Sequence, residues 1–207
     1  MIFTASERRF FDIQRVAQPH DISIFNCDWC EGRSYYADFC GLGFKYRPTR
    51  VLEIGVRYGY SGLAVCTGAQ EAGIEKIHYT GIDAEILCLD SNAAAEAKFR
   101  EFLPAVTTRF FRCDTLREGL PRKVLKEQFD YILVDGDHSY EGARADLMAC
   151  WPLLASGGIL VIDDLGMVDV QRAVDDHVAA LEAAGEPYRF QQHHNERIFA
   201  IFQKGKI

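Results

Sequence analysis

The sequence predicts an α/β fold built on a doubly wound, mostly parallel sheet. From Arg50 onward, short apolar runs alternate with stretches of helical periodicity, as in a series of βαβ units. Acidic residues stand at or near the end of each of the first five apolar runs, where an open parallel sheet binds ligands. The length of 207 residues suits one medium-sized domain.

The expected elements follow in order along the chain. Strands are expected over residues 51–54, 77–82, 106–112, 131–134 and 159–162. Helices are expected over 61–70, from a cap at Asp90 or Ser91 to Pro104, over 116–125, over 143–154 with an end at Gly157-Gly158, and over 168–184. The tail predicts a hairpin, with strands over 188–192 and 198–202 and a turn at His193-His194-Asn195.

The first 49 residues differ from the rest. They are rich in aromatic residues and lack strand periodicity, so we expect helices and loops that pack over the edge or mouth of the sheet. The predicted organisation is therefore an N-terminal segment over 1–49, able to cap a substrate, and a ligand-binding domain over 50–207. Within the segment, Cys27 and Cys30 are expected to pack around Trp29; a zinc site with His20 and Cys40 is the alternative.

Composition narrows the class of partner. A formal charge of −7 argues against nucleic acid, and no apolar run approaches the length of a membrane span. The N-terminus shows no secretory signal, and seven cysteines in a chain of this size suit reduced thiols. We therefore expect a cytoplasmic protein that acts on a small molecule.

The turn after the first strand carries glycines at 55, 59 and 62. They let a ligand approach the backbone, and the amides of the following helix can bind its polar groups. A dinucleotide fingerprint would need glycine where Arg57 stands, so a nicotinamide or flavin is disfavoured. Asp83 can accept both hydroxyls of a ribose. A negative rim of five acids suits a cationic ligand such as a sulfonium: Glu53, Asp83, Asp114, Asp135 and Asp163.

Two segments carry a family resemblance: Val51-Leu52-Glu53-Ile54-Gly55 with Gly59-Tyr60-Ser61, and Phe129 to His138 followed by Pro152-Leu153-Leu154 and Gly157-Gly158. They resemble the motifs of class I S-adenosylmethionine (SAM)-dependent methyltransferases, closest to the catechol-type and macrolide-sugar O-methyltransferases. The resemblance covers about 50–202. It implies a Rossmann-like sheet of seven strands, six parallel and the last antiparallel. It also implies that Glu53 and the Gly55 turn bind the methionine part of SAM, Asp83 the ribose and Asp114 the adenine. The remaining expected cofactor contacts are Tyr60, Ser61, Cys113 and Asp135.

A metal site is a further hypothesis. Asp135, Asp163 and Asp164 end two adjacent strands, and an all-oxygen set suits Mg²⁺, or else Ca²⁺ or Mn²⁺. Catechol-type enzymes usually have asparagine where Asp164 stands, whereas an acidic pair resembles the macrolide-sugar enzymes. His138 takes the place of the lysine that removes the hydroxyl proton in the catechol-type enzymes, so we expect His138 and Asp135 to be catalytic.

The sequence therefore predicts metal-assisted O-methylation of a small molecule. Two alternatives stay open, namely metal-independent methylation of another small nucleophile and a SAM-binding module without catalysis. The acceptor is not specified by these motifs. No long insertion separates the last two strands, which leaves the first 49 residues or the neighbouring subunit of a homodimer as the lid.

Overall fold

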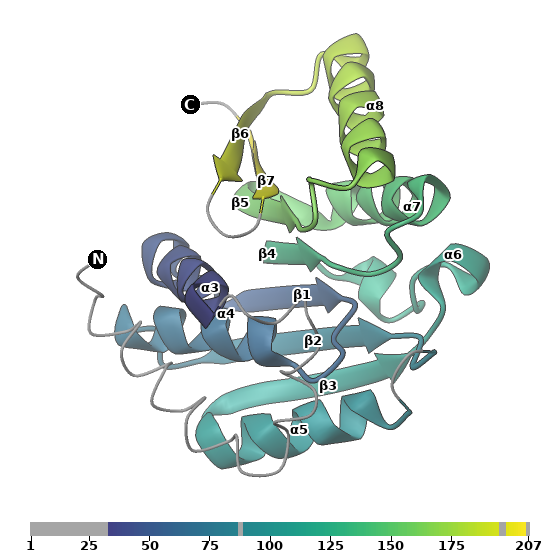
Figure 1. Cartoon of the computed structure of the whole chain (residues 1–207). Helices are drawn as coiled ribbons and strands as arrows, with labels where there is room; N and C mark the ends of the chain where they lie inside the picture. Colours follow the sequence, from purple (N-terminus) through teal and green to yellow (C-terminus); the bar gives the residue numbers. More distant parts are fainter. Residues whose placement is uncertain (1–32, 87–88, 195–197, 206–207) are drawn as a thin grey trace.

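The computed structural model describes residues 33–86, 89–194 and 198–205, in which helices and strands alternate (Figure 1). The strands are β1 (Arg50–Ile54), β2 (Ile77–Asp83), β3 (Val106–Arg112), β4 (Phe129–Val134), β5 (Leu154–Ile162), β6 (Tyr188–His194) and β7 (Ile198–Lys204). The helices are α3 (Arg33–Tyr46), α4 (Tyr60–Glu71), α5 (Ser91–Phe102), α6 (Thr115–Glu118), α7 (Tyr140–Cys150) and α8 (Val168–Ala184), with short 3-10 turns η2 (Val124–Lys126) and η3 (Trp151–Leu153).

The predicted sheet is confirmed. Its seven strands run in the order β3-β2-β1-β4-β5-β7-β6. Strands β1 to β5 are parallel, and β7 is antiparallel to both of its neighbours, β5 and β6. The order reverses between β1 and β4, which is the switch point where α/β sheets open a crevice for a ligand.

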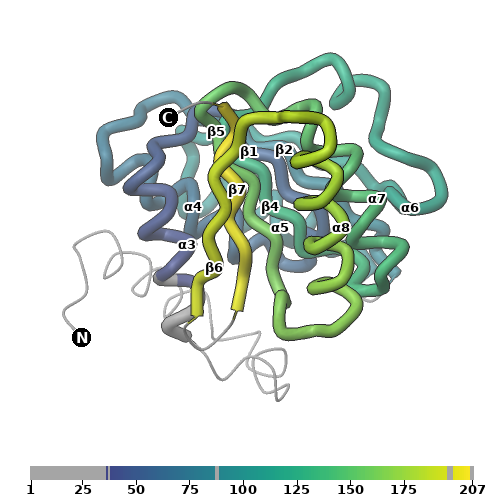
Figure 2. Tube along the Cα trace, turned by 90° about the horizontal axis from the view of Figure 1, so that it is seen from above, coloured from purple at the N-terminus to yellow at the C-terminus, as the bar shows by residue number. Residues whose placement is uncertain are grey.

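The sheet lies between two layers of helices (Figure 2). Alternate residues of its central strands pack into two apolar clusters, one under α3, α4 and α5 and the other under α7 and α8. Tyr131, for example, faces the first cluster and Ile132 the second. Burial on both faces explains why the central strands are almost wholly apolar in sequence. None of the helices in the described ranges has the length and apolar character that a membrane crossing requires.

Helix α3 packs along α4 and adds Phe39 and Cys40 to the first cluster. The two helices approach closely at glycines: an added Cβ at Gly43 would lie 2.0 Å from the Val65 carbonyl oxygen, and one at Gly68 would lie 1.9 Å from that of Cys40. Part of the N-terminal segment is thus a helix, as expected. Residues 1–32, with Cys27, Cys30 and most of the proposed substrate cap over 1–49, lie outside the described residues.

Two predicted boundaries are wrong because glycines bend the chain. The helix expected over 116–125 is broken into α6 and η2, since Gly119 has a φ of +70° and Pro121 follows. Gly157 and Gly158 do not end a helix but lie inside β5, where the register with β4 shifts between Phe129 and Tyr131. Gly157, with a φ of +82°, accommodates this irregularity.

The hairpin at the C-terminus is confirmed, but His193 and His194 are not its turn. Strand β6 continues through both residues, and His193 pairs with Phe199 across to β7. The imidazole of His193 stacks on the Phe199 ring at 4.5 Å, and its Nε2 lies 3.3 Å from Oδ2 of Asp38 in α3. Strand β6 therefore extends beyond its predicted limit, and one of these two contacts comes from α3, which is distant in the sequence.

Candidate active site

The parallel strands bring their carboxyl ends to one edge of the sheet. Ile54 pairs with Val134, and Val134 pairs with Ile162, so the turns that follow β1, β4 and β5 are neighbours. The turn after β2 lies beside them, since Ile54 also pairs with Ile82. This edge therefore gathers most of the residues that the sequence singles out.

The turn after β1 requires glycine at its first position. Gly55 has a φ of +85°, and an added Cβ would lie 1.9 Å from the carbonyl oxygen of Asp135. The amide of Asp135 in turn donates to the Ile54 carbonyl oxygen at 2.8 Å. The ends of β1 and β4 are therefore held in direct contact, and the turn must pass over them without a side chain.

The amino end of α4 follows this turn. Gly59 precedes the helix with a φ of +76°, and an added Cβ there would lie 2.8 Å from the Ala95 methyl group of α5. The next two residues, Tyr60 and Ser61, are buried. The Tyr60 ring lies 5.9 Å from that of Tyr36 and has the Lys98 ammonium above it at 5.2 Å. Both predicted contact residues thus lie in the first turn of α4, whose amides favour anionic groups.

Glu53 is placed differently from the other acids. It is the penultimate residue of β1 and points under α4, where its carboxylate accepts a hydrogen bond from the Tyr79 hydroxyl. Burial raises the pKa of Glu53 to about 8; the Tyr79 bond opposes this, and Asp135 and Asp83 add to it. The expectation that five acids line one charged edge of the sheet is therefore wrong for Glu53. Side chains alternate along β1, and that of Glu53 points toward the helix layer that contains α4.

Asp83, at the end of β2, organises the turns on either side of it. One carboxylate oxygen accepts from the Arg57 amide at 2.7 Å and the other from the Glu85 amide at 2.6 Å. Arg57 has a φ of +49°, so this bond fixes a strained residue of the Gly55 turn. Asp83 thus lies beside the Gly55 turn; it was expected to bind the ribose hydroxyls of a cofactor.

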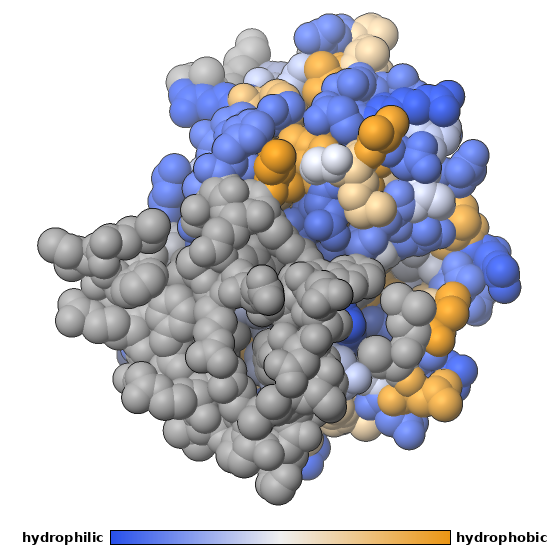
Figure 3. Space-filling view, in the orientation of Figure 1, coloured by the Kyte–Doolittle hydropathy of each residue, from blue (hydrophilic) through white to orange (hydrophobic). Residues whose placement is uncertain are grey.

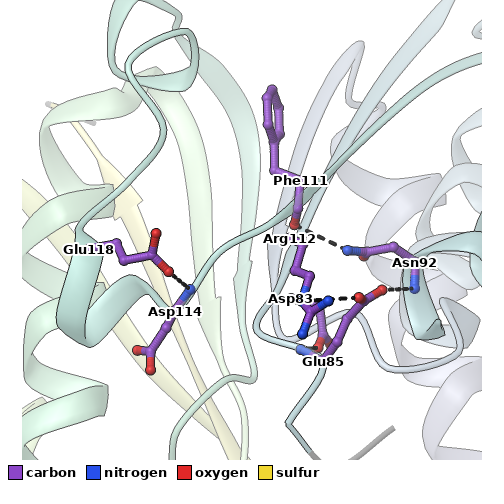
Figure 4. Close-up of polar contacts among 7 residues, drawn as sticks. All are labelled: Asp83, Glu85, Asn92, Phe111, Arg112, Asp114 and Glu118. Carbon is purple, nitrogen blue, oxygen red and sulfur yellow. Dashed lines mark hydrogen bonds and ion pairs between the residues drawn. The ribbon is translucent and has the colours of Figure 1, made fainter. Parts of the chain in front are cut away.

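Glu85 is a further residue of this edge, which was not predicted from the sequence. Its carboxylate accepts from the Asn92 amide at 3.1 Å and lies 3.5 Å from Nε of Arg112, as Figure 4 shows. It therefore supplies an acceptor to the first turn of α5, which the predicted cap, Asp90, does not supply through its side chain. A second acid two residues beyond Asp83 was the available signal.

The turn after β3 is held by Asp114. Its side chain accepts from the Arg117 amide at 3.2 Å. Its own amide donates to the Glu118 carboxylate at 3.1 Å, as Figure 4 shows, so the two acids together cap α6. Cys113 is buried beside it, and burial raises the pKa of its thiol, so the thiol stays neutral. Asp114 was expected to bind the adenine of a cofactor, and Cys113 was expected to be a further cofactor contact.

An acid–histidine cluster of Asp135, His138 and Asp164 forms between the ends of β4 and β5. Nε2 of His138 lies 3.3 Å from Oδ1 of Asp135 and 3.2 Å from Oδ2 of Asp164. One ligand atom from each of the three residues lies within 4.8 Å of the others, a spacing that a metal ion could bridge. All three side chains are partly exposed.

Asp163, the third predicted metal ligand, is not part of this cluster. It is 1% exposed, and its Oδ1 accepts from the Asp164 amide at 2.7 Å. Asp164 has a φ of +53°, a left-handed conformation that turns the chain sharply after β5. The structure thus brings together two of the three predicted carboxylates and places an imidazole beside them.

Comparisons with known proteins find methyltransferases, both among protein families and among solved structures. The family model described as "Methyltransferase domain" matches residues 52–165. The SAH-bound methyltransferase PaMTH1 of Podospora anserina is 17% identical, with a TM-score of 0.61 over 98% of this chain and 89% of that chain. The Bacillus cereus O-methyltransferase, in complex with SAH, is 14% identical, with a TM-score of 0.65 over 95% of this chain and 91% of that chain. The O-methyltransferase TomG of Streptomyces achromogenes, in complex with SAM, is 15% identical, with a TM-score of 0.62 over 98% of this chain and 91% of that chain. A search of curated proteins finds no match.

Proposed function

This chain belongs to the methyltransferase-domain family and is a SAM-dependent methyltransferase, and we propose that it methylates a hydroxyl oxygen of a small molecule. The observation that carries the proposal is the acid–histidine cluster, which stands beside the Gly55 turn at the switch point of the sheet. The Bacillus and Streptomyces structures that share the fold are both O-methyltransferases, which supports an oxygen acceptor.

The proposed cofactor site spans the carboxyl ends of β1 to β4. The amides of the first turn of α4 face the carboxylate of the methionine part. Asp83 is proposed to bind the ribose hydroxyls, and Cys113 and Asp114 the adenine. Glu53 lies beneath this turn, where its bond from Tyr79 would help to hold the turn in place for the methionine part. A cofactor held by these residues would have its sulfonium near the acid–histidine cluster, because Asp135 follows β4 beside the Gly55 turn.

His138 is proposed to take the proton of the acceptor hydroxyl on Nε2. The two carboxylates near this nitrogen, from Asp135 and Asp164, would stabilise the imidazolium that forms. The acceptor oxygen then forms a bond to the methyl carbon, and the electrons of the breaking sulfur–carbon bond stay on sulfur, which yields S-adenosylhomocysteine (SAH). Catalysis would depend mainly on holding oxygen, carbon and sulfur in line.

A divalent cation fits the same cluster. Asp135 and Asp164 offer the carboxylate oxygens that Mg²⁺, Ca²⁺ or Mn²⁺ prefers, and a bound ion would acidify the acceptor hydroxyl. The position of the His138 nitrogen between the carboxylates favours a second candidate, in which the histidine acts with the two acids and no metal. Chelation separates the two candidates.

The acceptor is proposed to carry an apolar body next to its hydroxyl. Met167 and Val168 are 45% and 83% exposed where α8 begins, and the Met167 amide donates to the Asp164 carbonyl oxygen at 2.8 Å. Figure 3 shows apolar side chains exposed among polar ones on the half of this face that carries β5, β7 and α8. Exposed apolar side chains beside the acid–histidine cluster would suit an apolar part of the substrate.

The first experiment is a calorimetric titration with SAH of the wild-type chain and the Asp83→Ala variant. The matched control is Asp130→Ala, because Asp130 also accepts two backbone amides, those of Thr49 and Arg50, but at the opposite edge of the sheet. We expect Asp83→Ala to abolish measurable binding and Asp130→Ala to retain it. A folded wild-type chain that does not bind SAH would refute the cofactor assignment.

The second experiment follows transfer of a labelled methyl group from SAM to a panel of hydroxylated small molecules. The assay is run with Mg²⁺, with EDTA, and with the His138→Ala variant. Loss of transfer in EDTA supports the metal, whereas full activity in EDTA and none in the variant supports the histidine alone. An unchanged rate in His138→Ala at every pH would remove His138 from the mechanism.

A further inference from the structure

Glu85 combines a strained backbone with a buried carboxylate, two residues beyond the proposed ribose ligand. Its φ of +55° lies in the left-handed region, although it is not a glycine. It is 7% exposed, and a carboxylate is costly to bury unless it is paired. Both features oppose folding, and backbone strain of this kind is concentrated at functional sites.

The side chain of Glu85 joins its own turn to two other elements (Figure 4). Its Oε1 accepts from the Asn92 amide at 3.1 Å in the first turn of α5, and its Oε2 lies 3.5 Å from Nε of Arg112 at the end of β3. The Asn92 side chain closes the network, since its Nδ2 donates to the Phe111 carbonyl oxygen at 3.2 Å. Residue 85 follows β2 in the chain but is therefore held in place by α5 and β3.

The amide of Glu85 carries this placement over to Asp83. It donates to Oδ1 of Asp83 at 2.6 Å, while Oδ2 accepts from the Arg57 amide at 2.7 Å. A carboxylate oxygen can accept more than one hydrogen bond, so each of the two could still accept from a hydroxyl group. The two amides thus set the orientation in which Asp83 would meet a ribose.

We propose that Glu85 is a positioning residue for the ribose of SAM, because its side-chain contacts fix the amide that orients Asp83. The inference rests on the proposed cofactor site, in which Asp83 binds the ribose hydroxyls. Both carboxylate oxygens of Glu85 contact the protein itself, so Glu85 acts through Asp83. Without this carboxylate, residue 85 would lose its ties to α5 and β3, and Asp83 would be held less firmly.

The test measures how well the full chain recognises one ribose hydroxyl. Calorimetry gives the affinities for methylthioadenosine and for its 2′-deoxy form, and the ratio of the two isolates the 2′-hydroxyl. A hydrogen bond to a charged group should make this ratio about tenfold or more in the wild-type chain. A substitution that only lowers stability changes both affinities alike and leaves the ratio as it was.

Two substitutions of Glu85 separate its hydrogen bond from its charge. Glu85→Ala should lower the ratio by about threefold or more, because Asp83 then holds the hydroxyl in poorer geometry. Glu85→Gln should keep the ratio within about twofold of wild type, because its amide oxygen still accepts from the Asn92 amide. An unchanged ratio in folded Glu85→Ala would overturn the proposal.

Two control variants lie in or next to the same helix. Glu96→Ala removes an exposed carboxylate of α5 that pairs with Arg100 at 3.4 Å, and it should leave the ratio unchanged. Leu103→Ala removes a buried side chain just beyond the other end of α5, so it should lower the melting temperature but not the ratio. A loss of ratio in either control equal to that in Glu85→Ala would overturn the proposal.

The remaining outcomes are also decisive. If Glu85→Ala does not fold, Glu85→Gly replaces it, because glycine adopts a positive φ without strain, and an unchanged ratio there overturns the proposal. A wild-type chain that binds SAH but does not distinguish the two nucleosides overturns it as well, since Glu85 would have no ribose contact to position. Failure of the wild-type chain to bind SAH would instead refute the proposed function.

Discussion

Replacing Glu53 with glutamine is expected to remove a pH dependence of folding that the wild-type chain carries. Glu53 is 1% exposed, and among the described residues its Oε1 has no hydrogen-bond partner. Burial raises its pKa from 4.5 to about 8, against the effect of the Tyr79 hydrogen bond. The folded chain therefore prefers the neutral acid near pH 7, and glutamine imitates that form.

The size of the effect follows from the two pKa values. Because the pKa is higher in the folded chain, its contribution to stability is complete below about pH 4.5 and is lost as the pH rises through 8. A difference of about 3.5 pH units corresponds to roughly 5 kcal/mol in total, of which about 3 kcal/mol falls between pH 5.5 and 8.5. For a chain of this length, that is a change of roughly 6–12 °C in melting temperature.

The assay is thermal unfolding, followed by circular dichroism, of both proteins without ligand at pH 5.5 and 8.5. Other titrating groups affect the two proteins alike, so the difference between their melting temperatures isolates Glu53. The Glu53→Gln variant should become the more stable protein, relative to wild type, as the pH rises. A difference that stays the same at both pH values, within about 2 °C, would refute the buried neutral acid.

Three further outcomes are expected. Gly55→Ala should cost about 3 kcal/mol or more, because strain at positive φ adds to a clash with the Asp135 carbonyl oxygen; Gly185→Ala, with a φ of +65° and open space around it, should cost only about 1 kcal/mol in the same urea titration. His193→Phe removes the contact with Asp38 but keeps an aromatic ring, so it should lower stability by less than about 1 kcal/mol, and a larger loss would show that the ion pair matters more than the stacking. EDTA should slow methyl transfer and Mg²⁺ should restore it; an unaffected initial rate would leave the acid–histidine cluster to act without a metal.

The order of elements could be predicted because it depends on local pattern. Strand β3 and helix α8 have the predicted bounds, Val106–Arg112 and Val168–Ala184, since apolar periodicity and flanking proline or glycine mark them within the chain. Strand ends were also readable, so the turns that form the candidate site could be identified. The wrong boundaries lie at two glycines with positive φ. Gly119 breaks a predicted helix in two, and Gly157 lies inside a strand where it was expected to end a helix.

The direction and burial of individual site side chains could not be read in this way. Asp146 falls on the apolar stripe of its helix with Ala143 and Leu147, a signal that was available, but its burial at 1% exposure depends on how α7 packs against the rest of the chain. Likewise, Glu85 supplies the acceptor for α5 only because the chain folds back after β2.

The sequence by itself determined the fold class, the family and the edge of the sheet where chemistry takes place, because each depends on residue types at fixed short spacings. The tertiary structure alone decided which acids meet. Asp164 adopts a left-handed conformation, so it and not Asp163 joins Asp135 and His138, and Glu53 turns away from the rim into the layer below. Alternation along β1 places Glu53 on the face it shares with Val51, but the helices that cover this face are brought there by tertiary packing, which a local pattern does not contain.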